Sequence, residues 1–135
     1  MSFTEAERAY LATQRLGRVA TASAAGEPDV APVTFEITAD ARIEIDGLDN
    51  PKTLKWRNVA ATGRAAFVVD DLHTIDPWTP RGIKLRGAAS ADTDPDGRRV
   101  IRITPETVWS WGINTDAPKH FGGVIERREV GTGNT

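Results

Sequence analysis

Three cations lie close together in the segment Asn50–Asn58, and their spacing suits the binding of an anion. Lys52 and Lys55 are three residues apart, and Arg57 follows two residues later. The Asn50-Pro51 pair predicts that a short helix begins here, with Asn50 as N-cap and proline at the first helical position. Free amide groups and the positive end of the helix dipole would join the cations in holding a phosphate. The alternative is a solvent-exposed charged helix that only connects two strands.

The sequence lacks the usual side-chain motifs of catalysis. It has no Gly-x-Ser-x-Gly elbow, no P-loop, no dinucleotide-binding glycine fingerprint and no His-Glu-x-x-His motif. It contains no cysteine, and its two histidines, His73 and His120, are far apart without metal-ligand spacing, so we expect no metal. Any reaction should therefore depend on a bound cofactor, which the protein orients and surrounds with suitable charges.

Length and composition indicate one globular domain over residues 1–135. The chain is 39% hydrophobic and 27% charged, which is ordinary for a folded protein. The net charge of -2 argues against a protein that mainly coats nucleic acid. No apolar run resembles a signal peptide or a membrane span, so we expect a cytoplasmic protein without membrane contact.

The remaining pattern is one of short strands and two short helices. Thr4 and Glu7 form a capping box that starts a helix, and this helix is expected to reach about Leu16 and to stop at Gly17. Apolar alternation and turn residues predict strands near 18–23, 30–37, 42–46, 64–70, 82–88, 100–103 and 107–113. This count favours a mainly β (α+β) domain built as an antiparallel barrel of six to seven strands.

Two prolines and two tryptophans mark special places in these strands. Pro32 cannot donate a ladder hydrogen bond, so its strand should lie at an edge or a bulge, where a ligand could reach the backbone. Pro105 is expected to separate the last two strands. Trp109 and Trp111 alternate on one strand face together with Ile113, and such a pair is more typical of packing than of ligand stacking.

The order and spacing of these segments resemble the pyridoxamine 5′-phosphate oxidase-like family. The resemblance rests on the hairpin 17–33, on Lys55-Trp56-Arg57-Asn58-Val59 before Gly63-Arg64, and on the strand 82–89. It covers residues 4 to 113, leaves 114–135 as a tail, and is closest to the deazaflavin branch of the family. It implies an FMN-binding split β-barrel that forms a homodimer and binds coenzyme F420, or alternatively FMN, in the groove between subunits.

Residue by residue, the resemblance implies a cofactor site on two segments. Lys55 matches the lysine that contacts the cofactor phosphate, with Arg57 and Asn58 as its neighbours. Pro32, Val33 and Thr34 match the strand residues that line the flavin or deazaflavin ring. An Arg-x-His pair that handles pyridoxamine phosphate is absent, and residues 114–118 stand in its place, which argues against vitamin B6 oxidation.

Taken together, the sequence predicts an F420-dependent oxidoreductase that transfers a hydride between the deazaflavin and a small unsaturated substrate. No catalytic acid or base is identified. The first alternative is a non-enzymic protein of the same fold that binds or carries a flavin, a deazaflavin or another ligand. The second is an oligonucleotide-binding barrel, supported only by the basic strand face of Lys84 and Arg86 near the tryptophans.

Overall fold

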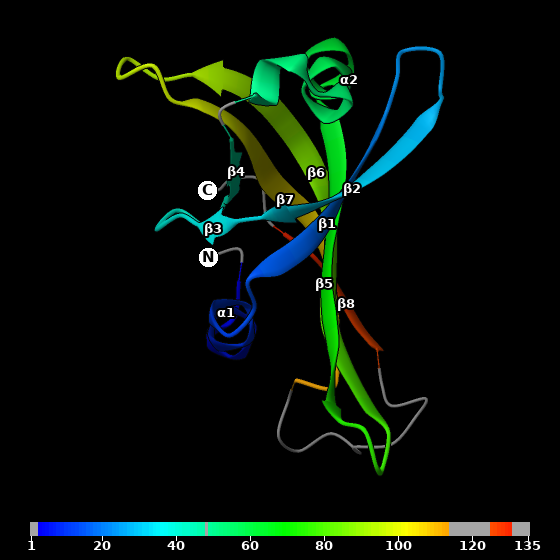
Figure 1. Cartoon of the computed structure of the whole chain (residues 1–135). Helices are drawn as coiled ribbons and strands as arrows, with labels where there is room; N and C mark the ends of the chain where they lie inside the picture. Colours follow the sequence, from blue (N-terminus) through cyan, green and yellow to red (C-terminus); the bar gives the residue numbers. More distant parts are fainter. Residues whose placement is uncertain (1–2, 48, 114–124, 131–135) are drawn as a thin grey trace.

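A computed structural model describes residues 3–47, 49–113 and 125–130 of the chain (Figure 1). Eight strands form one antiparallel sheet, in the order β2-β1-β5-β6-β7-β4-β3 with β8 added beside β7. The strands are β1 (Leu16–Ala22), β2 (Pro28–Thr34), β3 (Glu36–Ile37), β4 (Ile43–Asp46), β5 (Arg64–Thr74), β6 (Thr79–Thr93), β7 (Arg99–Trp111) and β8 (Ile125–Glu129).

The sheet curls round on itself without closing. β2 and β3 stand at opposite ends of the strand order, yet only Phe35 separates them in the chain. The two ends of the sheet must therefore approach each other, and β2 contacts β4 across the opening without pairing with it. The expected mainly β, antiparallel split barrel with two α-helices is confirmed, but the described residues form eight strands rather than the six to seven predicted.

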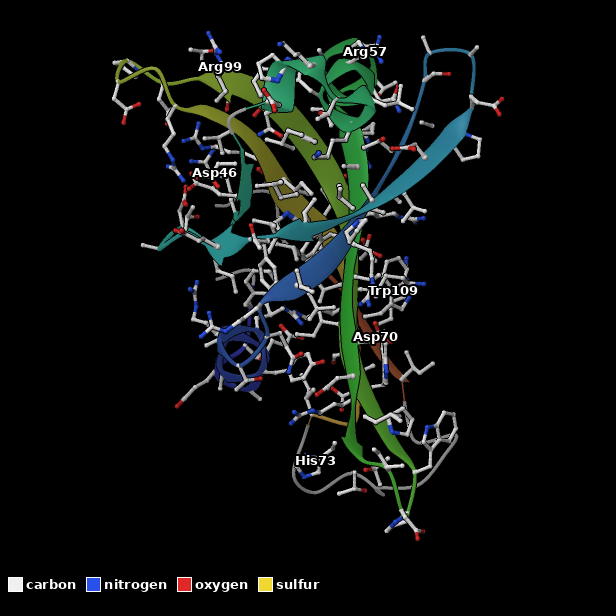
Figure 2. The ribbon with its side chains drawn as sticks, in the orientation of Figure 1. Asp46, Arg57, Asp70, His73, Arg99 and Trp109 are labelled. Carbon is white, nitrogen blue, oxygen red and sulfur yellow. The ribbon has the colours of Figure 1, made fainter. Side chains whose placement is uncertain are left out.

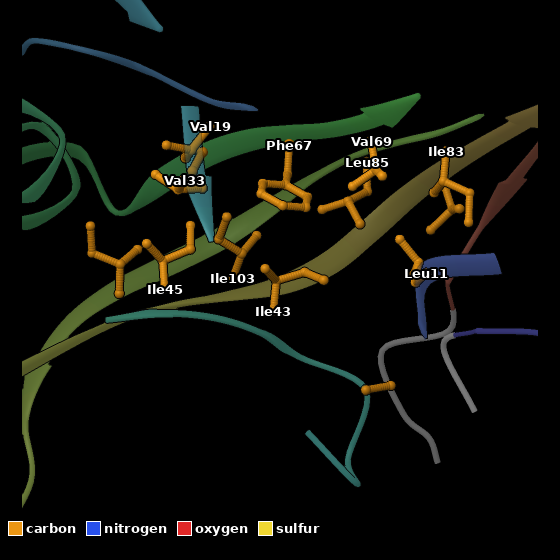
Figure 3. Close-up of a cluster of buried hydrophobic side chains, with 14 of the residues drawn as sticks. Leu11, Val19, Val33, Ile43, Ile45, Phe67, Val69, Ile83, Leu85 and Ile103 are labelled. Carbon is orange, nitrogen blue, oxygen red and sulfur yellow. The ribbon is translucent and has the colours of Figure 1, made fainter. Parts of the chain in front are cut away.

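The inner face of the curled sheet carries the hydrophobic core (Figure 3). Alternate residues of each strand supply it, since side chains along a strand point to opposite faces. Phe67 lies at its centre and meets Phe35 edge to face, with ring centroids 5.1 Å apart. Its ring presses on Gly17, where an added Cβ would lie 2.2 Å from Phe67 Cζ. The core side chains that Figure 3 labels are Leu11, Val19, Val33, Ile43, Ile45, Phe67, Val69, Ile83, Leu85 and Ile103.

The first helix, α1 (Glu5–Ala12), begins as expected but ends early. Thr4 accepts from the Glu7 amide and Glu7 accepts from the Thr4 amide, which confirms the capping box. The prediction that the helix reaches Leu16 and stops at Gly17 is wrong. Both residues belong to β1, where they pair with Thr34 and Val33, and sheet pairing outweighs the helix-ending tendency of glycine.

The basic segment is divided between a 3₁₀ turn, η1 (Asn50–Lys52), and α2 (Leu54–Thr62). Asn50 is therefore not the N-cap of α2, as we had expected. Its buried side chain instead donates to the carbonyl oxygens of Ile45 (3.1 Å) and Arg99 (3.0 Å). Thr53 caps α2 by accepting from the Trp56 amide at 3.2 Å. At the other end Gly63 takes the left-handed conformation with φ 68°, as predicted.

The C-terminal part of the sheet differs most from the sequence-based expectation. Residues 99–111 form the single strand β7, so the predicted break at Pro105 is wrong. Pro105 fits because β4 pairs with β7 only at 100–103 and β8 only at 107–111, so the position lies between the two partners. The register against β6 shifts here, leaving Glu106 as the extra residue of a bulge. β8 lies within residues 114–135, which we had expected to be a tail without a strand.

Candidate functional site

The cations of η1 and α2 lie at one end of the barrel, as Figure 1 shows for the two elements. Lys52 and Arg57 are exposed, and Lys55 is half-buried in the first turn of α2. Within residues 3–47, 49–113 and 125–130, no carboxylate forms an ion pair with any of the three. The Thr53 hydroxyl and carbonyl serve the Trp56 and Arg57 amides, which leaves the first two amides of the helix, Leu54 and Lys55, without a capping bond. The start of α2 therefore keeps its positive character.

The opposite side of α2 is buried and fixes the helix on the barrel. α2 packs against β1, β2 and β6, with Val59 in the core and Trp56 partly buried against it. Asn58 is buried, and its side-chain nitrogen donates to the Thr21 hydroxyl of β1 at 3.0 Å. Asn58 thus points toward the sheet, whereas Arg57 points to solvent (Figure 2).

The second predicted segment lies on β2. This strand is at the end of the strand order, so the expectation that Pro32 occupies an edge strand is confirmed. Pro32 and Thr34 are exposed on the outer face, and Val33 between them is buried in the core at 8% exposure. In the part of the chain that the structure describes, no hydrogen bond or ion pair joins Lys55 to these residues. The two predicted segments are connected by the packing of α2 on β2.

A second group of cations surrounds Trp109 on the outer face of the sheet (Figure 2 labels Trp109). Lys84 Nζ lies 4.4 Å from the centroid of the indole ring, Arg86 Cζ 5.3 Å and Arg127 Cζ 5.6 Å. We call these four residues the Trp109 cluster. The sequence placed Lys84 and Arg86 on one face, but Arg127 comes from β8, which the sequence did not predict.

A buried polar group joins α1 to the β5–β6 hairpin. Tyr10 donates its hydroxyl to Asp71 Oδ1 at 3.0 Å, and Arg81 contacts both Asp71 oxygens at 2.7 and 3.0 Å. Burial, with the hydrogen bond to Asp71, raises the pKa of Tyr10, and the Arg81 hydrogen bonds lower the pKa of Asp71. Because a buried phenol with a raised pKa and an engaged hydroxyl is a poor proton donor, we assign this group to structure.

Two other features bear on chemistry. A hollow of about 300 Å³ is lined by Asp46, Gly47, Gly97, Arg98 and Arg99, where the end of β4 meets the β6–β7 turn. Arg98 is paired with Asp46 and Glu44, whereas among the described residues no carboxylate forms an ion pair with the exposed Arg99. Among the described residues, no group of three His, Cys, Asp or Glu side chains could hold a metal ion. His73 is exposed near the end of β5, and His120 lies outside the described residues.

Comparison with known proteins bears on the family and the activity of the chain. The family model described as pyridoxamine 5′-phosphate oxidase matches residues 3–112. The chain is 44% identical over 124 residues to the 5a,11a-dehydrotetracycline/5a,11a-dehydrooxytetracycline reductase of Streptomyces rimosus subsp. rimosus, covering 86% of this chain and 87% of that protein.

Two solved structures share the fold. The conserved hypothetical protein Rv2991 of Mycobacterium tuberculosis has a TM-score of 0.70 at 20% identity, covering 83% of this chain and 86% of that one. The FAD binding protein of Mycobacterium smegmatis has a TM-score of 0.61 at 16% identity, covering 93% of this chain and 98% of that one.

Neither helix of the described residues is long and apolar enough to pass through a membrane.

Proposed function

Since the chain belongs to the pyridoxamine 5′-phosphate oxidase family and is 44% identical to a reductase, we propose that this oxidoreductase is coenzyme F420-dependent. In this proposal it transfers a hydride between the deazaflavin and a small unsaturated substrate. The reductase of Streptomyces rimosus acts on 5a,11a-dehydrotetracyclines, so a compound of that class is the first substrate to test.

The observation that carries the proposal is the cationic start of α2, for which the described residues supply no carboxylate partner. Lys55 is half-buried there, next to two amides without a capping bond. Most other cations of the sheet have a carboxylate partner, as Arg81 has Asp71 and Arg102 has Glu44, Asp92 and Asp94. A charged group without a partner at a helix start fits an anion that arrives with a ligand.

The cofactor would supply the hydride-transferring ring, and the chain would supply its placement. In this proposal Lys55 and Arg57 hold the phosphate, while Asn58 keeps α2 in position through its bond to Thr21. Pro32 and Thr34 face outward along β2 and would border the ring. Val33 would contribute its backbone only, because its side chain lies in the core.

The proposal includes a homodimer. Leu16, Val30 and Ile125 on the outer strand faces are 55%, 66% and 64% exposed. A second copy over part of this face would remove that apolar surface from water.

Titration of the purified protein with F420 and with FMN, followed by ligand fluorescence, tests the cofactor. We expect F420 to bind more tightly than FMN, and binding of neither below about 1 mM would contradict the proposal. Turnover of reduced F420 with a 5a,11a-dehydrotetracycline then tests the reaction. F420 binding without turnover of this compound or of a panel of enones would favour the carrier alternative.

A further inference from the structure

The Trp109 cluster gathers three cations around one indole ring. Lys84 and Arg86 come from β6, Trp109 from β7 and Arg127 from β8, and each cationic centre lies within 5.6 Å of the ring centroid. The negative face of the ring attracts each cation but cannot neutralise three of them. The cluster therefore keeps a net positive charge at the surface of a chain whose total charge is -2.

Neighbouring arginines on the same face are paired with carboxylates, so the excess of positive charge is confined to the Trp109 cluster. On the same outer face Arg18 pairs with Asp70 at 3.1 Å, and Arg64 pairs with Glu106 at 2.9 Å. Within the cluster, Arg127 forms an ion pair with Glu129 at 2.5 Å. In residues 3–47, 49–113 and 125–130, no carboxylate forms an ion pair with Lys84 or Arg86, and both are exposed. Two cations are thus available to an anionic partner.

Beside the cluster, the outer faces of β1 and β5 carry small side chains. The strand register places Arg18, Val68, Lys84, Trp109 and Arg127 in one row across five strands. In the next row Ala20 and Ala66 stand beside Arg86. Gly82 lies under Trp111, since a Cβ there would approach the indole Cζ2 within 2.5 Å. Ala20, Ala66 and Val68 are half-buried and form a patch of small side chains, against which a ring that meets the edge of Trp109 would lie.

From this arrangement we infer that the Trp109 cluster and the Ala20–Ala66–Val68 floor bind a planar, conjugated anion. Naming that anion as the substrate of the reduction rests on the proposed function. A flat ring gains contact with the small side chains and with the indole, and its delocalised negative charge meets Lys84 and Arg86. A saturated anion would gain only the charge contact, and an uncharged ring only the contact with the small side chains and the indole edge.

Three probes separate these contributions: 2-naphthoate, the uncharged 2-naphthamide, and cyclohexanecarboxylate, which is charged but not planar. We expect 2-naphthoate to bind most tightly, by calorimetry and by quenching of tryptophan fluorescence. Lys84→Gln and Arg86→Gln should each weaken naphthoate binding roughly tenfold and leave naphthamide unchanged. Arg64→Gln removes an exposed cation of the same face, 2.9 Å from Glu106, and should change none of the three affinities.

Equal affinity for the three probes, or unchanged naphthoate binding in both glutamine variants, would overturn the inference. Tighter binding of a single-stranded oligonucleotide at the same residues would also overturn it. If the double variant Lys84→Gln/Arg86→Gln no longer forms a dimer, the face is a contact between two copies of the chain, and the inference is again wrong. Naphthoate binding should persist when the protein is saturated with F420, and exclusion by F420 would reassign the cluster to the cofactor. The probes are tested first without F420. A protein that does not bind F420 could therefore still bind naphthoate, and failure of the cofactor proposal can be told apart from failure of this inference.

Discussion

Arg128 of β8 places its two terminal nitrogens 2.5 and 2.6 Å from the two carboxylate oxygens of Glu7 in α1. Glu7 is only 3% exposed and also accepts from the Thr4 amide in the capping box. The contact joins the first helix to the last described strand, 121 residues apart. A bidentate pair with one deeply buried carboxylate holds β8 to the rest of the barrel.

Arg128→Met should therefore destabilise the protein by about 3 kcal/mol, because it leaves the Glu7 carboxylate buried without its cation. The free energy of unfolding in urea measures the effect. Glu7→Gln/Arg128→Met should recover part of the loss, since no uncompensated charge remains. A loss below about 0.5 kcal/mol in Arg128→Met would show that the pair contributes little.

Gly17→Ala tests the close contact between β1 and the core. The added methyl group would lie 2.2 Å from Phe67 Cζ, and the Phe67 ring is itself fixed in the core against Phe35. We expect a loss of about 1–3 kcal/mol in the free energy of unfolding, as for other overpacked cores. Gly47→Ala is the control, because the nearest atom to its added Cβ is 3.8 Å away. In Gly17→Ala/Phe67→Leu the smaller side chain should relieve the clash, and a purely additive loss would contradict this explanation.

The pH dependence of stability tests the polar group of Tyr10, Asp71 and Arg81. The Arg81 hydrogen bonds, followed by that from Tyr10, lower the pKa of Asp71 from its ordinary value of 3.8. A carboxyl whose pKa is lower in the folded state stabilises the fold above its unfolded pKa, and this stabilisation is lost as the pH falls through the folded pKa. Asp71→Asn should thus cost about 1 kcal/mol at neutral pH, a modest figure because both partners are partly exposed.

The difference in unfolding free energy between the wild type and Asp71→Asn should stay constant down to about pH 5 and close below about pH 4. Urea unfolding at a series of pH values measures it. Asp49→Asn, at an exposed carboxylate without a side-chain cap bond, is the control for the removal of one negative charge from the surface. A gap that persists at the lowest pH at which the protein folds would assign the loss to altered hydrogen bonding rather than to charge.

The barrel itself could be predicted from the sequence because its strands alternate strongly. Ile43 and Ile45 are buried with charged residues between them, and Ile83 and Leu85 repeat the pattern. The start of α2 could not be predicted, because the Asn50 side chain is used by the carbonyl groups of Ile45 and Arg99 rather than by a helix. Such a contact depends on the tertiary fold and overrides the local capping preference.

The sequence gives a weaker signal for β8 and for the Trp109 cluster. β8 reads Ile-Glu-Arg-Arg-Glu, which has almost no apolar alternation, and its pairing with β7 and the Glu7 contact keep it in the sheet. The cations of α2 were visible as residue types, and the structure adds that they lack an ion pair among the described residues. Lys84 and Trp109 become neighbours only through the β6–β7 register, which a bulge at Glu106 shifts.

The last prediction concerns Lys55 and separates a cofactor site from a merely charged helix. If the Lys55 ammonium meets the cofactor phosphate at the half-buried start of α2, Lys55→Ala removes a charge-assisted hydrogen bond worth about 1.5–3 kcal/mol. The Kd for F420 should then rise about ten- to a hundredfold. Lys52→Ala removes the same charge from the exposed end of η1, three residues away, and should change the Kd far less. Fluorescence titration of both folded variants measures the difference, and equal Kd values would make α2 a connector and place the phosphate elsewhere.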